Sequence, residues 1–382
     1  VSTPAIMAVI KPFVVSLLTL LVAQSEATKL QVSGTKLTYG GETVFLNGVN
    51  IAWNDYGNDF GNGAYDGTLE QWITDIANAG GNSIRIWVHV EGYHTPVFDN
   101  NGYVTSCDTT GDFVKDMKKL LDHAQAANVL VIPVLWNGAY LTNQKVIDLI
   151  WDDNDKLDSY FNNCLDGLVN AVKDHPALGA WEVVNEPEGS IKVEGSEEAC
   201  YDTTVIGPNG AGWTGLSIPM EKMLRFIGRQ NAALRERDPN TLITLGSWGQ
   251  FAQNDAFSNS HNHYTDECLN KAAGSSSAHL DFYQMHTYDW GGYWSPNAPF
   301  TVDASDYKLD KPNVIGEFAS VCALGTPLND LFEHAYTHGY NGAWTWQYNA
   351  GGDCTDSQQD QQMALGHLKD RTDNGLVAFP VN

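Results

Sequence analysis

Residues 129–136 read VLVIPVLW, a run of apolar residues with no charged side chain in it. A strand this uniformly apolar is expected to be buried on both faces, which is typical of parallel sheets covered by helices. Further short runs of this kind recur along the chain: FLNGVNI (45–51), SIRIWV (83–88), ALGAWEVVNE (177–186), TLITLGSW (241–248), DFYQMHTY (281–288), NVIGEFA (313–319) and GAWTWQY (342–348). With residues 129–136, the sequence predicts eight strands.

Patterns typical of amphipathic helices fill several intervals between these runs. Apolar residues recur at spacings of three and four in 69–76, 113–124, 157–172, 220–234 and 328–335. We expect Thr68 to cap the first of these helices, because Gln71 three residues later completes the pattern of a capping box. The acidic run DDND at 152–155 is typical of a helix N-terminus, where the helix dipole favours negative charge.

Strands alternating with helices over roughly 300 residues match the size of a (β/α)8 TIM barrel, so we predict the α/β fold class with that architecture. An open doubly wound sheet is the alternative. It would normally place a glycine-rich phosphate-binding turn after its first strand, whereas this chain has NIAWN at 50–54. Residues 29–45 alternate polar and apolar side chains around Gly34 and Gly40-Gly41, which predicts a short N-terminal β-hairpin that caps the bottom of the barrel.

The first 27 residues have the pattern of a secretory signal peptide. Lys11 precedes the apolar run FVVSLLTLLVA (13–23), and Ser25-Glu26-Ala27 forms a small-x-small cleavage pattern. The run is about half the roughly 20 residues that span a bilayer, so a membrane anchor is disfavoured. Residues 1–6 precede Met7 and are set aside. We expect a secreted protein in which residues 28–382 form one domain, because no linker or low-complexity segment divides them.

Six cysteines are spread singly along the chain, without the close pairs of a zinc site. Six cysteines allow 15 disulfide connectivities. Of these we favour the pairing of neighbours in order, because each bridge would clip consecutive loops of a barrel. The expected bridges are Cys107–Cys164, Cys200–Cys268 and Cys322–Cys354.

Charge and composition narrow the possible partners. The 21 Lys and Arg residues against 46 Asp and Glu residues give a net charge of −25, which would repel nucleic acid and anionic membranes. The 12 Trp, 16 Tyr and 14 Phe residues exceed what core packing normally needs, so some of them should bind a ligand. Predicted strand ends carry no lysine for Schiff-base chemistry and no phosphate-binding turn. We expect no cofactor, no metal and a monomer.

In a barrel, polar and aromatic residues at the C-terminal ends of the strands line the active site. Here these residues are Trp53, Arg85, Trp87, Trp136, Asn137, Asn185, Glu186, Trp248, His286, Tyr288, Glu317 and Trp346. Two carboxyl groups among tryptophans suit glycosidic bond cleavage, which needs one acid and one carboxylate. Glu182 shares strand parity with Glu186 and is expected to be a structural carboxylate with a buried partner. Glu188 and Glu194 are expected to be solvated.

These motifs, in this order, resemble family 5 of the clan A glycoside hydrolases. The matching stretches are SIRIW (83–87), WEVVNEP (181–187), HTY (286–288), IGEF (315–318) and WTWQY (344–348). LNGVNIAW (46–53) and VLWNG (134–138) are similar to the endo-β-1,4-mannanase branch, which includes secreted digestive enzymes of invertebrates.

The resemblance implies a role for each matching residue. Glu186 would be the general acid/base and Glu317 the nucleophile of a retaining mechanism, with Arg85 and Tyr288 holding Glu317 ionised. Asn185 would bind the sugar 2-hydroxyl, His286 would lie near the acid/base, and Trp346 would floor the subsite of the reacting mannose. Trp136 matches less closely. The implied substrate is mannan, glucomannan or galactomannan. An endo-β-1,4-glucanase (cellulase) and an inactive polysaccharide-binding barrel stay as alternatives.

Overall fold

The computed structural model describes Val1, residues 28–151 and residues 154–382. The expected signal peptide (1–27) and the acids Asp152 and Asp153 therefore lie largely or wholly outside the described residues. Within the described residues, eight parallel strands close into a barrel in the order β10-β11-β12-β13-β4-β5-β8-β9. Each coincides with a predicted strand: β4 (Leu46–Ala52), β5 (Ser83–Trp87), β8 (Leu130–Asn137), β9 (Ala180–Asn185), β10 (Leu242–Ser247), β11 (Tyr283–His286), β12 (Asn313–Glu317) and β13 (Gly342–Thr345).

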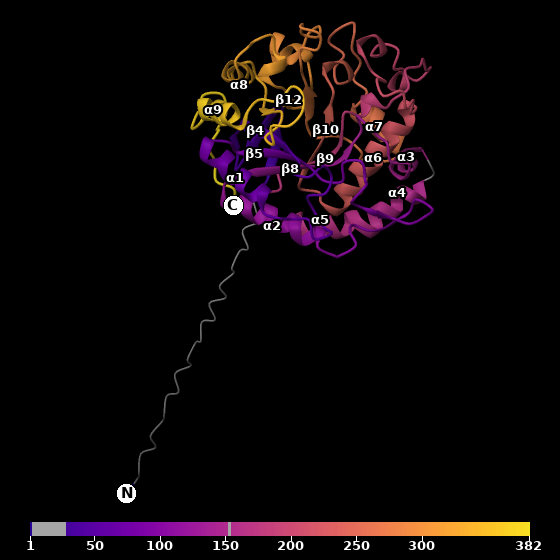
Figure 1. Cartoon of the computed structure of the whole chain (residues 1–382), viewed down its shortest axis with the longest axis horizontal. Helices are drawn as coiled ribbons and strands as arrows, with labels where there is room; N and C mark the ends of the chain where they lie inside the picture. Colours follow the sequence, from indigo (N-terminus) through magenta and orange to yellow (C-terminus); the bar gives the residue numbers. More distant parts are fainter. Residues whose placement is uncertain (2–27, 152–153) are drawn as a thin grey trace.

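Helices surround the barrel, with the strands inside the ring that they form (Figure 1). Their bounds are α1 (Thr68–Ala79), α2 (Phe113–Ala126), α3 (Gln144–Trp151), α4 (Asn154–Tyr160), α5 (Asp166–Val172), α6 (Met220–Arg237), α7 (Asp266–Ala273), α8 (Leu328–Thr337) and α9 (Gln358–Leu368). A π-helical turn at Phe161–Leu165 joins α4 to α5. Each strand of the barrel is buried along its whole length, as the continuous apolar runs predict.

The expected cap of α1 is wrong by one residue. Gly67 precedes the helix with a φ of 86°, Thr68 is already the first helical residue, and the N-cap glycine has no side chain to cap this end. Instead, the carboxylate of Asp66 accepts a hydrogen bond from the Thr68 N–H at 2.9 Å. Glycine tolerates the left-handed conformation that this entry into the helix needs.

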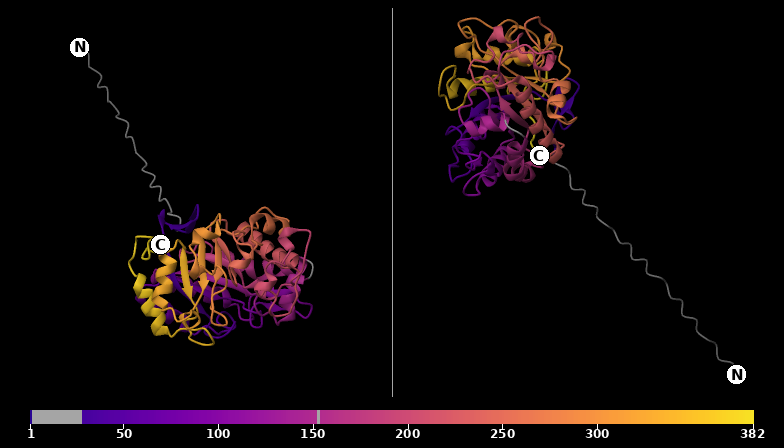
Figure 2. Two further views of the ribbon diagram at one scale, coloured as in Figure 1. Left: turned by 90° about the horizontal axis from the view of Figure 1, so that it is seen from above. Right: turned by 90° about the vertical axis from the view of Figure 1, so that its right-hand side faces the viewer.

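A small antiparallel sheet closes the N-terminal end of the barrel. It has three strands, β1 (Leu30–Ser33), β2 (Lys36–Tyr39) and β3 (Glu42–Thr43), one more than the predicted hairpin. The Leu37 N–H donates to the side chain of Asn341, directly before β13, which ties the sheet to the bottom of the barrel. In Figure 2 these indigo strands lie close to the C-terminus, and the Thr28 N–H donates to the Asn382 carbonyl.

All three expected disulfides are present, and the described residues include no free cysteine. Cys322–Cys354 joins the segments that follow β12 and β13, and Cys322 and Cys354 pack with Tyr288 and Trp346. A second antiparallel pair, β6 (Val97–Phe98) and β7 (Val104–Ser106), follows β5. Among the described residues, no helix has the length and apolarity needed to cross a membrane.

Candidate active site

The C-terminal ends of the strands bring the predicted polar residues together. Arg85 lies on β5, Asn185 ends β9 and Glu186 follows it, His286 ends β11, and Glu317 ends β12. The register between β11 and β12 shifts after Met285, so that His286 lies opposite Glu317 rather than Gly316. Because parallel strands of a barrel all end at one face, residues far apart in sequence converge there.

The two candidate catalytic carboxyls are neighbours. One oxygen of Glu186, one oxygen of Glu317 and one ring nitrogen of His286 all lie within 4.8 Å of one another. Retaining glycosidases hold their two carboxyls about 5 to 5.5 Å apart, whereas inverting enzymes need about 6.5 to 9.5 Å to admit a water molecule. The side chain of Glu186 is 19% exposed and that of Glu317 is 6% exposed. The separation fits direct attack by one carboxylate on the sugar.

Arg85 lies at the centre of the polar network and is fully buried. Its Nη1 donates to Glu317 at 2.6 Å and to Asn50 at 2.8 Å, while its Nε and Nη2 donate to both oxygens of Glu182. Nη2 also donates to Asn185 at 2.7 Å. The expectation that Glu182 has a buried partner is therefore confirmed. The fork of the guanidinium lets one cation orient two acids and two amides.

Both oxygens of the Glu317 carboxyl accept hydrogen bonds, which favours its ionised form. Arg85 donates to Oε1, and the Tyr288 hydroxyl donates to Oε2 at 3.0 Å. Burial raises the pKa of Glu317, and the charge of Arg85 and its hydrogen bond to the carboxyl oppose that rise. Glu186 contacts no cation. Burial raises its pKa from 4.5 to about 7, although the nearby charge of Arg85 opposes this rise and that of Glu182 adds to it. Of the two carboxyls, Glu186 is the one placed to carry a proton at neutral pH.

His286 lies between the two carboxyls. Its Nδ1 is 2.7 Å from Glu186 Oε1 and 3.5 Å from Glu317 Oε2. Burial lowers the pKa of His286 to about 4, so the ring is neutral at neutral pH. Because His286 is neutral, Arg85 is the cation that balances the charge of the Glu317 carboxylate.

Glu186 adopts a strained backbone conformation, with φ 44° and ψ 54°. The left-handed region is uncommon for residues other than glycine and is found often at functional sites. The Glu186 N–H donates to the Gly246 carbonyl at 2.6 Å, which holds this turn against β10. In this conformation a carboxyl oxygen of Glu186 lies within 4.8 Å of one of Glu317.

The expectation for Glu188 is wrong, because this residue is fully buried rather than solvated. Its oxygens accept hydrogen bonds from Ser247 Oγ and the Tyr264 hydroxyl at 2.7 Å each, and from the Trp248 N–H at 3.2 Å. A short 3-10 helix, Pro187–Gly189, turns the chain inward directly after Glu186. Glu194, in the same loop, is partly exposed.

Of the predicted tryptophans, Trp346 lies at the site and Trp136 does not. Trp346 packs with Trp53 and Trp87, at ring-centroid distances of 5.8 and 5.9 Å, to form an aromatic wall. Trp136 is 1% exposed and packs among core rings, and its indole N–H donates to Gln230 on α6. It lies between β8 and the helices, so the structure argues against a sugar platform there.

The sequence interpretation missed Gln284 and Asn50 as members of the network. Gln284 donates to Glu182 at 2.8 Å, and Asn50 accepts from Arg85 while donating to the Gly316 carbonyl. The signal was present for Gln284, since it lies two residues before His286 and so faces the same side of β11. Asn50 is buried on β4, where an amide needs hydrogen-bond partners.

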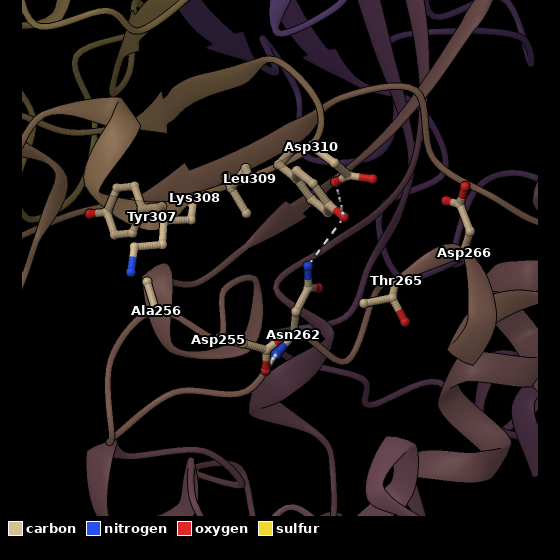
Figure 3. Close-up of a pocket in the computed structure, with 10 residues that line it drawn as sticks. Asp255, Ala256, Asn262, Thr265, Asp266, Tyr307, Lys308, Leu309 and Asp310 are labelled. Atoms are coloured by element: carbon tan, nitrogen blue, oxygen red, sulfur yellow. Dashed lines mark hydrogen bonds between the residues drawn. The ribbon is translucent and has the colours of Figure 1, made fainter.

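A separate pocket of about 370 Å³ is lined by residues of the segment that includes Asn262 and of the segment that includes Asp310 (Figure 3). Tyr283 also lines it and begins β11, whereas His286 ends that strand. Several of the pocket's polar groups are already paired. Asn262 donates to the Tyr283 hydroxyl, which donates to Asp310, and Asp266 pairs with Lys311. The pocket is therefore distinct from the group of acids at the barrel mouth.

Comparisons with known proteins agree with this geometry. Residues 37–379 match the family described as cellulase (glycosyl hydrolase family 5). A mannan endo-1,4-beta-mannosidase from Cryptopygus antarcticus is 46% identical over 362 residues, which cover 92% of this chain and 94% of the relative. A protein of the same name from Mytilus edulis is 45% identical, with coverages of 92% and 95%. The crystal structure of an endo-1,4-beta-mannanase from Eisenia fetida superposes with a TM-score of 0.91 at 46% identity, covering 93% of this chain and 100% of that one. The chain belongs to glycosyl hydrolase family 5.

Proposed function

We propose that this protein is a retaining endo-β-1,4-mannanase that hydrolyses internal bonds of mannan, glucomannan and galactomannan. The observation that carries the proposal is the pair of carboxyls, Glu186 and Glu317, whose oxygens lie within 4.8 Å. In this proposal Glu186, beside His286, carries the proton, and Glu317, beside Arg85, is the carboxylate. The relatives from Cryptopygus antarcticus and Mytilus edulis, named for this activity, support the choice of polymer.

In the first step, the Glu317 carboxylate attacks the anomeric carbon while the bond to the leaving oxygen breaks. Glu186 gives its proton to that oxygen, so the leaving chain departs as an alcohol. Glu317 becomes a neutral ester, and the negative charge is now on Glu186. Arg85 and the Tyr288 hydroxyl position Glu317 before the attack, through hydrogen bonds of 2.6 and 3.0 Å.

In the second step, Glu186 takes a proton from water as the water oxygen attacks the same carbon. The ester bond breaks and Glu317 recovers its charge. Two inversions at one carbon retain the anomeric configuration. Glu186 can act as a base here because the esterified Glu317 no longer carries a charge.

Asn185 and Trp346 bind the sugar in this proposal. The Asn185 side-chain oxygen accepts from Arg85, and its amino group lies 3.3 Å from Asn137, so one N–H is left for a substrate hydroxyl. Trp346 presents an aromatic face beside Trp53 and Trp87, which suits the apolar face of a pyranose.

Replacement of Glu317 by Gln tests the nucleophile. Loss of the attacking carboxylate should abolish hydrolysis of mannohexaose, while the Arg85 and Tyr288 contacts allow the amide to fit. Undiminished hydrolysis by Glu317→Gln would refute the assignment. For Glu186, its Gln variant should regain turnover in azide when the substrate is an aryl mannoside whose phenolate leaves without a proton, because azide attacks the glycosyl-enzyme without a general base and forms the mannosyl azide.

The polymer is tested separately, because the two carboxyls do not distinguish the epimers at C2. Galactomannan and carboxymethylcellulose assayed side by side distinguish a mannanase from the endo-β-1,4-glucanase alternative. Activity confined to the glucan would reject the mannan proposal. Binding without hydrolysis of either polymer would favour the inactive-barrel alternative.

We propose further that the protein is secreted after removal of residues 1–27, and that residues 28–382 form a single catalytic domain that acts as a monomer. Three disulfides support an oxidising compartment. N-terminal sequencing of the protein recovered from the culture medium tests the cleavage site, and sedimentation equilibrium tests the monomer.

A further inference from the structure

A line of hydrogen bonds inside the barrel leads from Arg85 to the candidate acid/base. Arg85 pairs with Glu182, and Glu182 Oε2 accepts from Gln284 Nε2 at 2.8 Å. Gln284 Oε1 lies 3.3 Å from His286 Nε2, and His286 Nδ1 lies 2.7 Å from Glu186 Oε1. Gln284 and His286 are both fully buried, so water does not substitute for these partners.

The ion pair fixes which way the Gln284 amide points. Glu182 accepts two hydrogen bonds from Arg85 and is therefore a carboxylate that needs donors. The amino end of Gln284 must face it, because the oxygen end would place two acceptors in contact. The oxygen of Gln284 then faces His286 Nε2, and the only group that can satisfy this pair is a hydrogen on Nε2.

We propose that Gln284 is a positioning residue that keeps the His286 hydrogen on Nε2, so that Nδ1 accepts a hydrogen bond from protonated Glu186. The proposal rests on the proposed role of Glu186 as acid/base. In a neutral ring one nitrogen carries hydrogen and the other accepts, so a hydrogen on Nε2 leaves a lone pair on Nδ1. That lone pair stabilises the acid form of Glu186 and disfavours its carboxylate. Once Glu186 has given up its proton, the same lone pair strengthens it as a base toward water.

Two glycines make room for this line of residues. A Cβ at position 316 would lie 2.0 Å from Gln284 Oε1. A Cβ at position 246 would lie 2.6 Å from Glu182 Oε1 and 3.0 Å from His286 Nε2. Neither glycine has a positive φ, so backbone conformation does not require them. Glycine is required because a larger side chain at either position would collide with the neighbouring polar side chains. The close packing around Gln284 is therefore part of the fold.

The charged groups that face His286 come from three strands. They are Glu317 on β12, Arg85 on β5, Glu182 on β9 and Glu186 directly after β9. The Tyr288 hydroxyl, which follows β11, contacts Glu317 rather than the ring. Burial lowers the pKa of His286 to about 4 despite the two nearby acids, which supports a neutral ring. Gln284 is the neighbour that decides between the two neutral tautomers.

The pH profile of kcat/KM in Gln284→Met tests the proposal. Methionine has a similar size but accepts no comparable hydrogen bond, so His286 can move its hydrogen to Nδ1 and donate it to the Glu186 carboxylate. The basic limb of kcat/KM on mannohexaose should then shift about one pH unit lower. A loss of the Glu182 contact alone would act in the opposite direction, because a less balanced Glu182 charge raises the pKa of Glu186. A basic limb whose midpoint stays at the same pH, or moves to a higher pH, overturns the proposal.

Gln230→Met is the matched control. Gln230 is fully buried on α6, outside the barrel, and accepts from Trp136. Its replacement should lower stability and leave the pH of the basic limb unchanged. An equal shift of the basic limb in both variants would mean that the loss of any buried glutamine changes the pH profile. That result would overturn the proposal.

A direct observation of the ring covers the case in which Gln284→Met does not fold. Nitrogen-15 NMR of protein labelled at the histidine rings, with the His286 signals identified by their loss in His286→Gln, reports which nitrogen carries hydrogen. We expect hydrogen on Nε2 and a bare Nδ1 at pH 6. Hydrogen on Nδ1 overturns the proposal, whether or not the protein hydrolyses mannan. Absence of hydrolysis in the unmodified enzyme would instead refute the proposed function.

Discussion

Glu188→Gln should make the free energy of unfolding fall less steeply as the pH rises toward 7. Glu188 is fully buried, and burial raises its pKa from 4.5 to about 7, although Tyr264, Ser247 and the Trp248 N–H donate to it. The folded state therefore holds this proton more tightly than the unfolded chain. As pH rises from 4.5 through 7, the unfolded state loses its proton first and becomes favoured, so stability falls. A shift of about 2.5 units corresponds to about 3 kcal/mol.

The assay is urea unfolding with the disulfides intact, at several pH values between 4.5 and 8 and at constant ionic strength. The free energy of unfolding of the wild type should fall about 3 kcal/mol more than that of Glu188→Gln across this range. The variant also loses the acceptor for the Trp248 N–H, but this cost is the same at each pH and does not change the slope.

Glu194→Gln is the control, because Glu194 lies in the same loop but is partly exposed. Its pH dependence should match the wild type. Parallel curves for the wild type and Glu188→Gln would refute the reasoning, because they would mean that Glu188 is ionised at no cost or reaches water when buried.

Three further outcomes follow from the site and the bridges. The basic limb of kcat/KM on soluble mannan should have its midpoint near pH 7, because Glu186 must be protonated and burial raises its pKa to about 7. A value of kcat/KM that stays constant up to pH 9 would contradict this. Tyr288→Phe removes the 3.0 Å hydrogen bond to Glu317, so kcat on mannohexaose should fall about 10-fold or more with little change in KM. Replacement of Cys200 and Cys268 by serine opens a bridge between residues 68 apart, and should lower the free energy of unfolding by about 4 kcal/mol in urea.

Several features could be predicted from the sequence because they depend on local pattern. The eight barrel strands are apolar along their length, and each one is identifiable from that run. The convergence of Arg85, Glu186 and Glu317 follows from one rule, that parallel strands of a barrel end at the same face. The order of the cysteines was enough to favour the observed pairing, because consecutive loops of a barrel lie close together and neighbouring cysteines can therefore bridge them.

Other features depend on contacts between strands that no local pattern reports. Glu188 has the surroundings of a loop acid in the sequence, and the donors that make its burial tolerable, Ser247, Trp248 and Tyr264, lie more than 50 residues away. Trp136 ends an apolar strand as Trp346 does, but its ring packs outward against α6. The side of the sheet on which a strand-end residue lies changes with a one-residue shift in register, such as the shift between β11 and β12.

The sequence by itself predicted the barrel and placed Glu186 and Glu317 at the ends of two of its strands, because both follow from residue type and from periodicity along the chain, while the resemblance to family 5 implied a role for each acid. Only the tertiary structure shows the contacts that make the two carboxyls differ in their affinity for a proton. That difference depends on Arg85 contacting Glu317 and on neutral His286 contacting Glu186, and the energies of buried charges change steeply over the few ångströms that separate these groups.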